Sequence, residues 1–324
     1  MLTGILSFII GIGVFIFALK YLRERLEKLL SKRTLSVLGK FSIKRVPSFL
    51  VGAVATALFQ SSTATTVLTV QLVNLGAVSL FSATAIILGA NIGTSITAFL
   101  FSFASLPVSL FMGTLVFVGL VGSFLPFKNK EFSQNIFGVF IGLGLLFVGL
   151  STLSSALNVE PIQNFFVFIF SRHDFFLLLL LFGAVFAALI SSSAAATGII
   201  LMLAANGAIS LVSAMFIVLG TNIGTCIIPI FSSFRTNITA KRAAYINLFF
   251  NLFGIIFAVP VLLFFSLSIS KFLSHFSSRL EFQIAYFNLF FNIITAVAML
   301  PFVKQFNKLI SFTIKNRDGN VPPR

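Results

Sequence analysis

The strongest constraint on the fold is an internal repeat. Residues 51–103 align with residues 182–234 without a gap, at an offset of 131, and about half of the aligned positions are identical. Apolar segments can resemble one another through composition alone, but this alignment also matches Asn, Gly, Ser and Thr. The sequence therefore predicts two copies of one structural unit, each with a Ser-rich segment followed by a segment rich in Gly and Asn.

Composition indicates the environment of both copies. The chain is 58% hydrophobic and 9% charged, with a mean hydropathy of +1.10. A soluble domain of 324 residues could not bury so much apolar surface. Runs without charge recur, and each is close to the ~20 residues that span a hydrocarbon core of ~30 Å. We therefore expect an all-α polytopic protein of the cell (cytoplasmic or inner) membrane, surrounded by lipid and without an added soluble domain.

The apolar segments fall into three kinds. Five are expected to be ordinary transmembrane helices: 2–21, 107–127, 135–157, 244–268 and 282–302. Two, 78–104 and 208–234, are expected to be helices broken by a Gly/Asn/Thr cluster. Two more, about 47–75 and 178–206, carry a Ser/Thr cluster at their centre and are expected to be re-entrant hairpins. The domains are then repeat 1 (1–127), repeat 2 (135–268), a final transmembrane helix (282–302) and a basic cytoplasmic tail (303–324).

The distribution of charge predicts the topology. If each hairpin returns to its own side, the chain crosses the membrane seven times, and 19 of its 22 Lys and Arg share one side. They lie in the expected loops 20–45, 128–130 and 235–242 and in the tail 304–324. The positive-inside rule places that side, and the C-terminus, in the cytoplasm. Three crossings per repeat make the two repeats inverted. The net charge of +15 thus reflects topology, and we expect no nucleic-acid partner.

Polar side chains gather at the centre of each expected hairpin, as Gln60-Ser61-Ser62-Thr63 and as Ser191-Ser192-Ser193. Such groups are costly at membrane depth unless they bond one another, water or a ligand. Ser and Thr can bond back to helix carbonyls, but that explains a dense and duplicated cluster poorly. We expect these clusters to bind a ligand, whereas for Thr65, Thr66 and Thr197 both explanations stay open.

A second duplicated motif is Gly-x-Asn-Ile-Gly-Thr, at residues 89–94 and 220–225. Two glycines four residues apart can form a helix-packing face. With Asn and Thr inside it, the duplicated motif favours an unwound turn, whose carbonyls would bind Na⁺ and whose amides would bind an anion.

Apart from Lys20 at the end of 2–21, the expected membrane segments carry no charge, and this suggests the type of ligand. Proton-coupled carriers normally need a titratable group at membrane depth, whereas Na⁺ needs only neutral oxygens. An anion held without Lys or Arg would need helix N-termini, amides, hydroxyls and bound cations. His173 and His275 lie in expected loops without zinc-type spacing, and no nucleophile–base pair is apparent. We expect neither an enzyme nor a resident cofactor.

A second, shorter internal repeat relates residues 244–251 to residues 285–292. It places Asn247 and Asn251, and likewise Asn288 and Asn292, four residues apart on one helix face. Such side chains are typical of interhelical hydrogen bonds in lipid, so we expect packing rather than substrate contact for these four.

With these motifs the chain resembles the sodium/phosphate cotransporter family (type II), as a bacterial-type member without a C-terminal regulatory domain. That family carries a Gln-Ser-Ser cluster in each of two inverted repeats and Gly-x-Asn-Ile-Gly-Thr after each, and the resemblance covers residues 1–302. Ser191 stands where the family usually has Gln. The resemblance implies that the hairpin tips meet the unwound turns near mid-membrane. It implies a phosphate site formed by Gln60, Ser61, Ser62, Ser192 and Ser193, and Na⁺ ligands among Thr63, Asn91, Thr94, Ser95, Ser191, Asn222 and Thr225.

The function expected from this resemblance is symport of inorganic phosphate with Na⁺, the coupling ion, by alternating access. Transport of another oxyanion or a carboxylate, and net phosphate export, stay open as alternatives, as does assembly into a homo-oligomer. An ion channel or a scaffold subunit is a rival from another class. A scaffold would not need the duplicated polar clusters.

Overall fold

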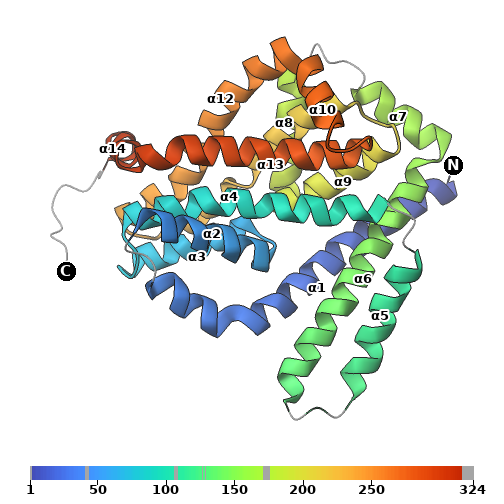
Figure 1. Ribbon diagram of the computed structural model, residues 1–324, viewed down its shortest axis with the longest axis horizontal. Coiled ribbons are helices and arrows are strands. Elements are labelled where there is room, and N and C mark those ends of the chain that lie inside the picture. The colour runs from blue at the N-terminus through green and yellow to red at the C-terminus, as the bar shows by residue number, and fades with distance from the viewer. Residues whose placement is uncertain are drawn as a thin grey trace.

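The computed structural model describes residues 2–40, 44–105, 109–125, 127, 129–170 and 176–315. Helices and their connecting turns account for all of these residues, which confirms the expected all-α fold (Figure 1). The helices are α1 (Leu2–Lys40), α2 (Arg45–Phe59), α3 (Ser62–Asn74), α4 (Leu80–Ser102), α5 (Ser109–Phe124), α6 (Lys130–Leu157), α7 (Glu160–Phe170), α8 (Phe176–Ile190), α9 (Ser193–Ala205), α10 (Leu211–Gly224), α11 (Ile227–Ser232), α12 (Ile238–Ser274), α13 (Leu280–Met299) and α14 (Val303–Thr313), with 3₁₀ turns η1 (Phe103–Ser105) and η3 (Leu300–Phe302).

Six helical stretches of the described chain are long and apolar enough to cross a membrane: Thr3–Leu29, Leu80–Ser105, Lys130–Leu157, Leu211–Ser232, Ile238–Ser274 and Leu280–Thr313. Large apolar side chains such as Phe124, Phe264 and Leu267 are more than 80% exposed, which suits contact with lipid. The protein is therefore a multi-pass membrane protein. The seventh expected crossing corresponds to α5, whose 16 residues are shorter than the ~20 that a perpendicular crossing needs.

Two expected loops are helical instead. The segment 20–45 was expected to be a basic loop, but α1 continues through it to Lys40. Leu, Arg, Glu and Lys fill residues 22–30 without Gly or Pro, and these are strong helix formers. The tail, expected from residue 303, begins with the amphipathic helix α14, whose apolar side chains Val303, Phe306 and Ile310 are buried.

The two copies of the repeat pack in the same way. A methyl group added to Gly89 on α4 would lie 1.9 Å from the carbonyl oxygen of Phe49 on α2. The equivalent group on Gly220 would lie 2.0 Å from the carbonyl oxygen of Leu180 on α8. The backbones of α2 and α4, and of α8 and α10, therefore approach too closely for any residue but glycine at these crossings.

The same contacts fix the direction of the helices. Gly89 packs against Phe49, and Gly93, one turn later, packs against Ala53, so α2 and α4 run in the same direction. The connecting helix α3 must then run back between them, and α2–α3 is a helical hairpin with its tip at residues 60–61. Gly220 and Gly224 pack likewise against Leu180 and Ala184, so α8–α9 is a second hairpin. Their re-entrant position in a membrane and the inversion of the repeats stay predictions.

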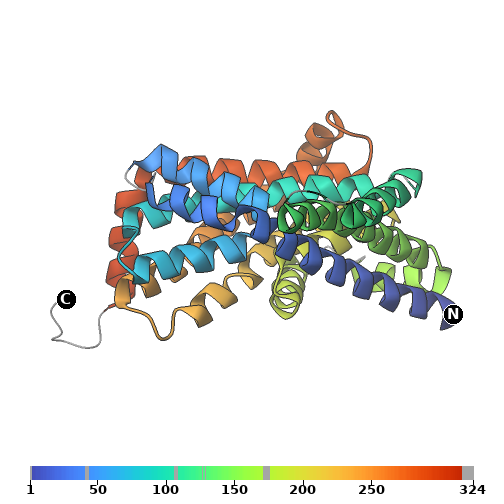
Figure 2. The same ribbon diagram turned by 90° about the horizontal axis from the view of Figure 1, so that it is seen from below.

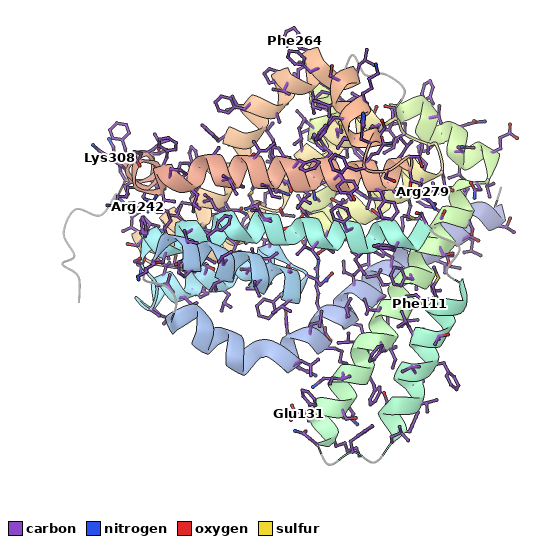
Figure 3. All side chains as sticks on the ribbon, viewed as in Figure 1. Phe111, Glu131, Arg242, Phe264, Arg279 and Lys308 are labelled. Atoms are coloured by element: carbon purple, nitrogen blue, oxygen red, sulfur yellow. The ribbon has the colours of Figure 1, made fainter. Side chains whose placement is uncertain are left out.

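The remaining helices surround these two units. In Figures 1 and 2 α13 lies beside α4 along its length, while α1, α5 and α6 form a group on one flank. Figure 3 places Arg242 and Lys308 near the end of α13 where α14 begins, and Arg279 at the other end. The basic residues 242 and 308 thus lie far from Arg279, although which end is cytoplasmic stays a prediction.

Candidate functional site

The two hairpin tips have the same backbone conformation. Gln60 and Ser191 occupy the left-handed region, with φ of 54° and 60°. They are the only non-glycine residues among those described with positive φ. Such a conformation costs about 1–2 kcal/mol for a side chain other than glycine, and retained strain is often found at functional sites. Ser191, the departure from the family's usual Gln, therefore keeps the geometry of the tip.

The residue after each strained position caps the next helix. The Ser61 hydroxyl oxygen accepts a hydrogen bond from the backbone N–H of Ala64, and Ser192 accepts one from Ala195, both at 3.1 Å. Serine is among the preferred N-cap residues for this reason. Each tip therefore presents the N-terminus of a 13-residue helix, α3 or α9, where the helix dipole favours an anion.

One arginine joins the two tips. The Arg23 Nε–H of α1 donates to the backbone oxygen of Gln60 at 3.2 Å, and its Nη2–H donates to the Ser192 hydroxyl oxygen at 2.8 Å. The first contact is to repeat 1 and the second to repeat 2. The structure thus brings together two clusters that lie 131 residues apart in the chain. It also supplies a positive charge at their junction.

Two expectations are wrong at this contact: Arg23 was expected in the loop 20–45, and the anion site was expected to lack Lys and Arg. Arg23 lies on a helical stretch that is apolar and long enough to span the membrane, Thr3–Leu29. The uninterrupted run of helix formers after Lys20 was the signal that could have placed this arginine on the helix.

Three further polar groups at the tips have no hydrogen-bond partner among the described residues. Ser62 and Ser193, at the first position of α3 and α9, are 8% and 5% exposed, and their hydroxyls make no hydrogen bond to any described residue. The side-chain oxygen of Gln60 is buried and likewise without a partner. Buried polar groups are normally paired, so these oxygens are available to a ligand.

For the threonines of the first hairpin, both ligand binding and hydrogen bonding within the helix were left open. Thr65 and Thr66 differ in this respect. The Thr65 hydroxyl donates to the backbone oxygen of Ser61 at 3.1 Å and accepts from Thr56 at 2.9 Å, so Thr65 has the packing role. The buried Thr66 hydroxyl has no partner in the described chain. Thr63 is partly exposed at the tip, and Ser191 is exposed.

Only one of the two Gly-x-Asn-Ile-Gly-Thr motifs interrupts its helix as expected, the second, within 208–234. The first lies inside the continuous helix α4, so the expected break within 78–104 is wrong. The second ends α10 at Gly224, and a short turn leads into α11. The glycines instead make the close helix contacts described above, which is the packing role that the sequence also allowed.

Five of the seven expected Na⁺ ligands lie near α12 and α13, whereas Thr63 and Ser191 lie at the tips. The five are Asn91, Thr94, Ser95, Asn222 and Thr225. The Asn91 side-chain amide donates to the Asn247 side-chain oxygen at 3.3 Å, and Asn251 donates to the same oxygen at 3.2 Å. Asn251 also donates to the Cys226 sulfur, and the Cys226 thiol donates to the backbone oxygen of Asn222. A chain of polar contacts therefore connects the Asn of one motif to the Asn of the other.

Of the expected Na⁺ ligands outside the tips, Thr94, Ser95 and Thr225 bond mainly to backbone oxygens. Ser95 donates to the backbone oxygen of Asn288 at 3.3 Å and accepts from the Asn292 amide at 3.0 Å. Thr94 donates to Ala90, and Thr225 lies within hydrogen-bond distance of the Thr221 and Asn222 oxygens. No hydrogen bond in the described chain joins these residues to either tip. The structure thus contains two polar regions where one was expected.

Comparison with known proteins gives consistent results. The family model described as Na⁺/Pi-cotransporter matches residues 14–155 and 173–272. YqeW of Bacillus subtilis (strain 168) is 29% identical over 312 residues, which are 96% of this chain and 98% of that protein. YjbB of Escherichia coli O157:H7, whose name proposes inorganic phosphate export, is 31% identical over 261 residues, 80% of this chain. The chain spans about half of YjbB, 47% of its length. No solved structure matches the chain.

Proposed function

Because the chain belongs to the Na⁺/Pi-cotransporter family, we propose that it carries inorganic phosphate across the membrane together with Na⁺ by alternating access. The observation that carries this proposal is the contact of Arg23 with both hairpin tips, to Gln60 and to Ser192. A guanidinium group is a preferred partner of phosphate because its planar N–H donors match phosphate oxygens. Two of its five N–H donors are used in the structure, which leaves others for a ligand.

The proposed phosphate site combines three kinds of donor. The N-termini of α3 and α9 supply backbone amides and favourable dipoles, as at other anion sites. The unpaired hydroxyls of Ser62 and Ser193 can donate to phosphate oxygens. Arg23 supplies the formal charge between them. Since each repeat contributes one tip, movement of one repeat against the other would open the site to alternate sides.

Na⁺ is the proposed coupling ion because no acidic or histidine side chain hydrogen-bonds to either tip within the described chain. Arginine does not exchange its proton in proteins, so Arg23 does not serve as a proton carrier. The direction of transport in the cell is a separate matter. The name of YjbB proposes phosphate export, which favours net export as the second candidate function.

Transport itself is tested in proteoliposomes with radiolabelled phosphate. We expect saturable accumulation when an inward Na⁺ gradient is present, and little accumulation with a proton gradient alone. Net export would appear as Na⁺-dependent loss of internal phosphate that exceeds uptake under the reversed gradient. Flux that rises linearly with phosphate and ignores Na⁺ would instead indicate a channel, and the absence of any phosphate flux would exclude transport of this substrate.

A double-mutant cycle tests whether the two tips form one site. Ser62→Ala and Ser193→Ala each remove a hydroxyl that bonds no described residue, so stability should change little. Each loss of a hydrogen bond to charged phosphate should cost roughly 1.5–3 kcal/mol, about tenfold to a hundredfold in affinity. Because both hydroxyls contact one ligand, we expect the double mutant to deviate from additivity by 0.5 kcal/mol or more.

The measurement for this cycle is phosphate affinity of the purified protein. Ser133→Ala on α6 is the matched control, since Ser133 is also 8% exposed and makes no hydrogen bond to either tip in the described chain. Its affinity for phosphate should equal that of the unmodified protein. Affinities that stay unchanged in both Ser variants would show that the tips are packing features.

A further inference from the structure

The asparagine pairs of α12 and α13 share an unusual feature. In each pair the second amide donates to the oxygen of the first, from Asn251 to Asn247 at 3.2 Å and from Asn292 to Asn288 at 3.1 Å. In each pair the oxygen of the second residue is buried without any partner in the described chain. Asn251 and Asn292 are both 1% exposed. Buried carbonyl oxygens are normally paired, so two unpaired ones at equivalent positions indicate a ligand.

The two unpaired oxygens belong to one region. Asn91 contacts the first pair, and Ser95, one turn further along α4, contacts the second pair. Gly254, one turn past Asn251, packs against Phe291 and Thr295, which lie on either side of Asn292 in the chain. Both asparagines therefore lie where α4, α12 and α13 meet.

The chemistry of this region selects a cation. The Asn251 and Asn292 amide N–H groups already donate to protein atoms, so at these two residues only the carbonyl oxygens remain for a ligand. Carbonyl oxygens are ligands for hard cations, whereas divalent ions in proteins usually also take carboxylates. The described chain has no group of acidic, His or Cys side chains that could hold a metal ion. Neutral oxygens alone suit a monovalent ion such as Na⁺.

We propose that the side-chain oxygens of Asn251 and Asn292 bind Na⁺ where α4, α12 and α13 meet. This assignment rests on the proposed function for its role in coupling, and it replaces the packing role that the sequence suggested for these residues. The same polar contacts reach Cys226 and Asn222 of repeat 2 through Asn251. Bound Na⁺ would thereby stabilise one arrangement of the two repeats.

Na⁺ binding is measured as the thermal stability of the purified full chain at increasing NaCl, with KCl and choline chloride at equal ionic strength. A ligand that binds only the folded state raises stability in a concentration-dependent way. We expect Na⁺ to stabilise the unmodified protein more than K⁺ or choline does. Asn251→Ala and Asn292→Ala should raise the half-saturating Na⁺ concentration about tenfold or more, because each loses a ligand of the ion.

Asn135→Ala is the matched control. Asn135 is buried, and its side-chain oxygen accepts a hydrogen bond from Arg25 at 3.3 Å, so it is paired and lies on α6. This variant should lose stability but keep the half-saturating Na⁺ concentration of the unmodified protein. If the Ala variants do not fold, Asn251→Asp and Asn292→Asp serve as second variants. Each keeps the size and the oxygen of the side chain and adds a negative charge, so it should lower the half-saturating Na⁺ concentration.

Two results would overturn this assignment: an unmodified protein with no Na⁺-specific stabilisation, or variants that keep its half-saturating Na⁺ concentration. Phosphate binding to the same preparations separates this result from the proposed function. Phosphate binding without a Na⁺ effect would remove the cation site and leave the phosphate site. A Na⁺ effect without phosphate binding would leave the cation site and remove the phosphate site.

Discussion

Arg23→Ala is expected to lower phosphate affinity more than a hundredfold and to abolish transport. The substitution removes the only side chain that hydrogen-bonds to both tips in the described chain, to Gln60 and to Ser192. It also removes the formal charge that offsets phosphate. Loss of charge-assisted hydrogen bonds of this kind costs about 3 kcal/mol, which corresponds to a factor of more than a hundred.

Arg25→Ala provides the control for charge. Arg25 lies two residues further along α1, and donates to Asn135 at 3.3 Å and stacks over the ring of Tyr21 instead of contacting a tip. Both variants lower the net charge by the same amount. If the contact with the tips is what matters, only Arg23→Ala should lose affinity for phosphate. Arg23→Lys should retain part of the affinity, because lysine keeps the charge but loses the planar arrangement of donors.

Phosphate affinity, Na⁺-driven uptake and thermal stability are measured for all three variants. Equal losses of affinity in Arg23→Ala and Arg25→Ala would trace the effect to overall charge. A loss of stability in Arg23→Ala with normal phosphate affinity would show that Arg23 only ties the hairpins together.

Gly89→Ala and Gly220→Ala are expected to cause the largest losses of stability. Their added methyl groups would lie 1.9 and 2.0 Å from backbone oxygens of α2 and α8, and backbone atoms cannot rotate out of the way as a side chain can. Each hairpin must then separate from its partner helix. Overpacking of this kind costs roughly 2–3 kcal/mol, which corresponds to a fall in Tm of about 3–4 °C for a chain of this size.

Gly113→Ala on α5 is the matched control, because nothing lies within 4 Å of its added methyl group. Alanine favours a helix over glycine by up to about 1 kcal/mol, so this variant should be slightly more stable. The test compares the melting temperatures of the three variants with that of the unmodified protein in one detergent. If the motifs were cation-binding turns, the Gly89 and Gly220 variants would melt normally and lose Na⁺ dependence instead.

The sequence by itself determined the class of the protein and its repeated unit. Both follow from local properties that survive in any packing: the length of the apolar runs, and the ungapped match of residues 51–103 with 182–234. The tips were also predictable as polar centres, because Gln60-Ser61-Ser62-Thr63 and Ser191-Ser192-Ser193 interrupt apolar segments. That Ser61 and Ser192 cap the next helices is visible only in the structure. The family followed from the same motifs.

The predictions from the sequence were wrong where one motif or residue type is compatible with two structural roles. Gly-x-Asn-Ile-Gly-Thr could form an unwound turn or a packing face, and only the approach of α2 to Gly89 and Gly93 selects packing. The positive-inside rule interprets every arginine near a helix end as a marker of topology. It therefore assigned Arg23 to a loop, although α1 continues to Lys40.

The tertiary structure decided which distant side chains meet. Arg23 and Ser192 are 169 residues apart, and Ser95 and Asn292 are 197 apart. No local pattern encodes such pairs, because they depend on how complete helix faces pack against one another. Helix formation and capping are set within a few residues along the chain, whereas the position of a charge at the junction of two repeats depends on the packing of several helices at once.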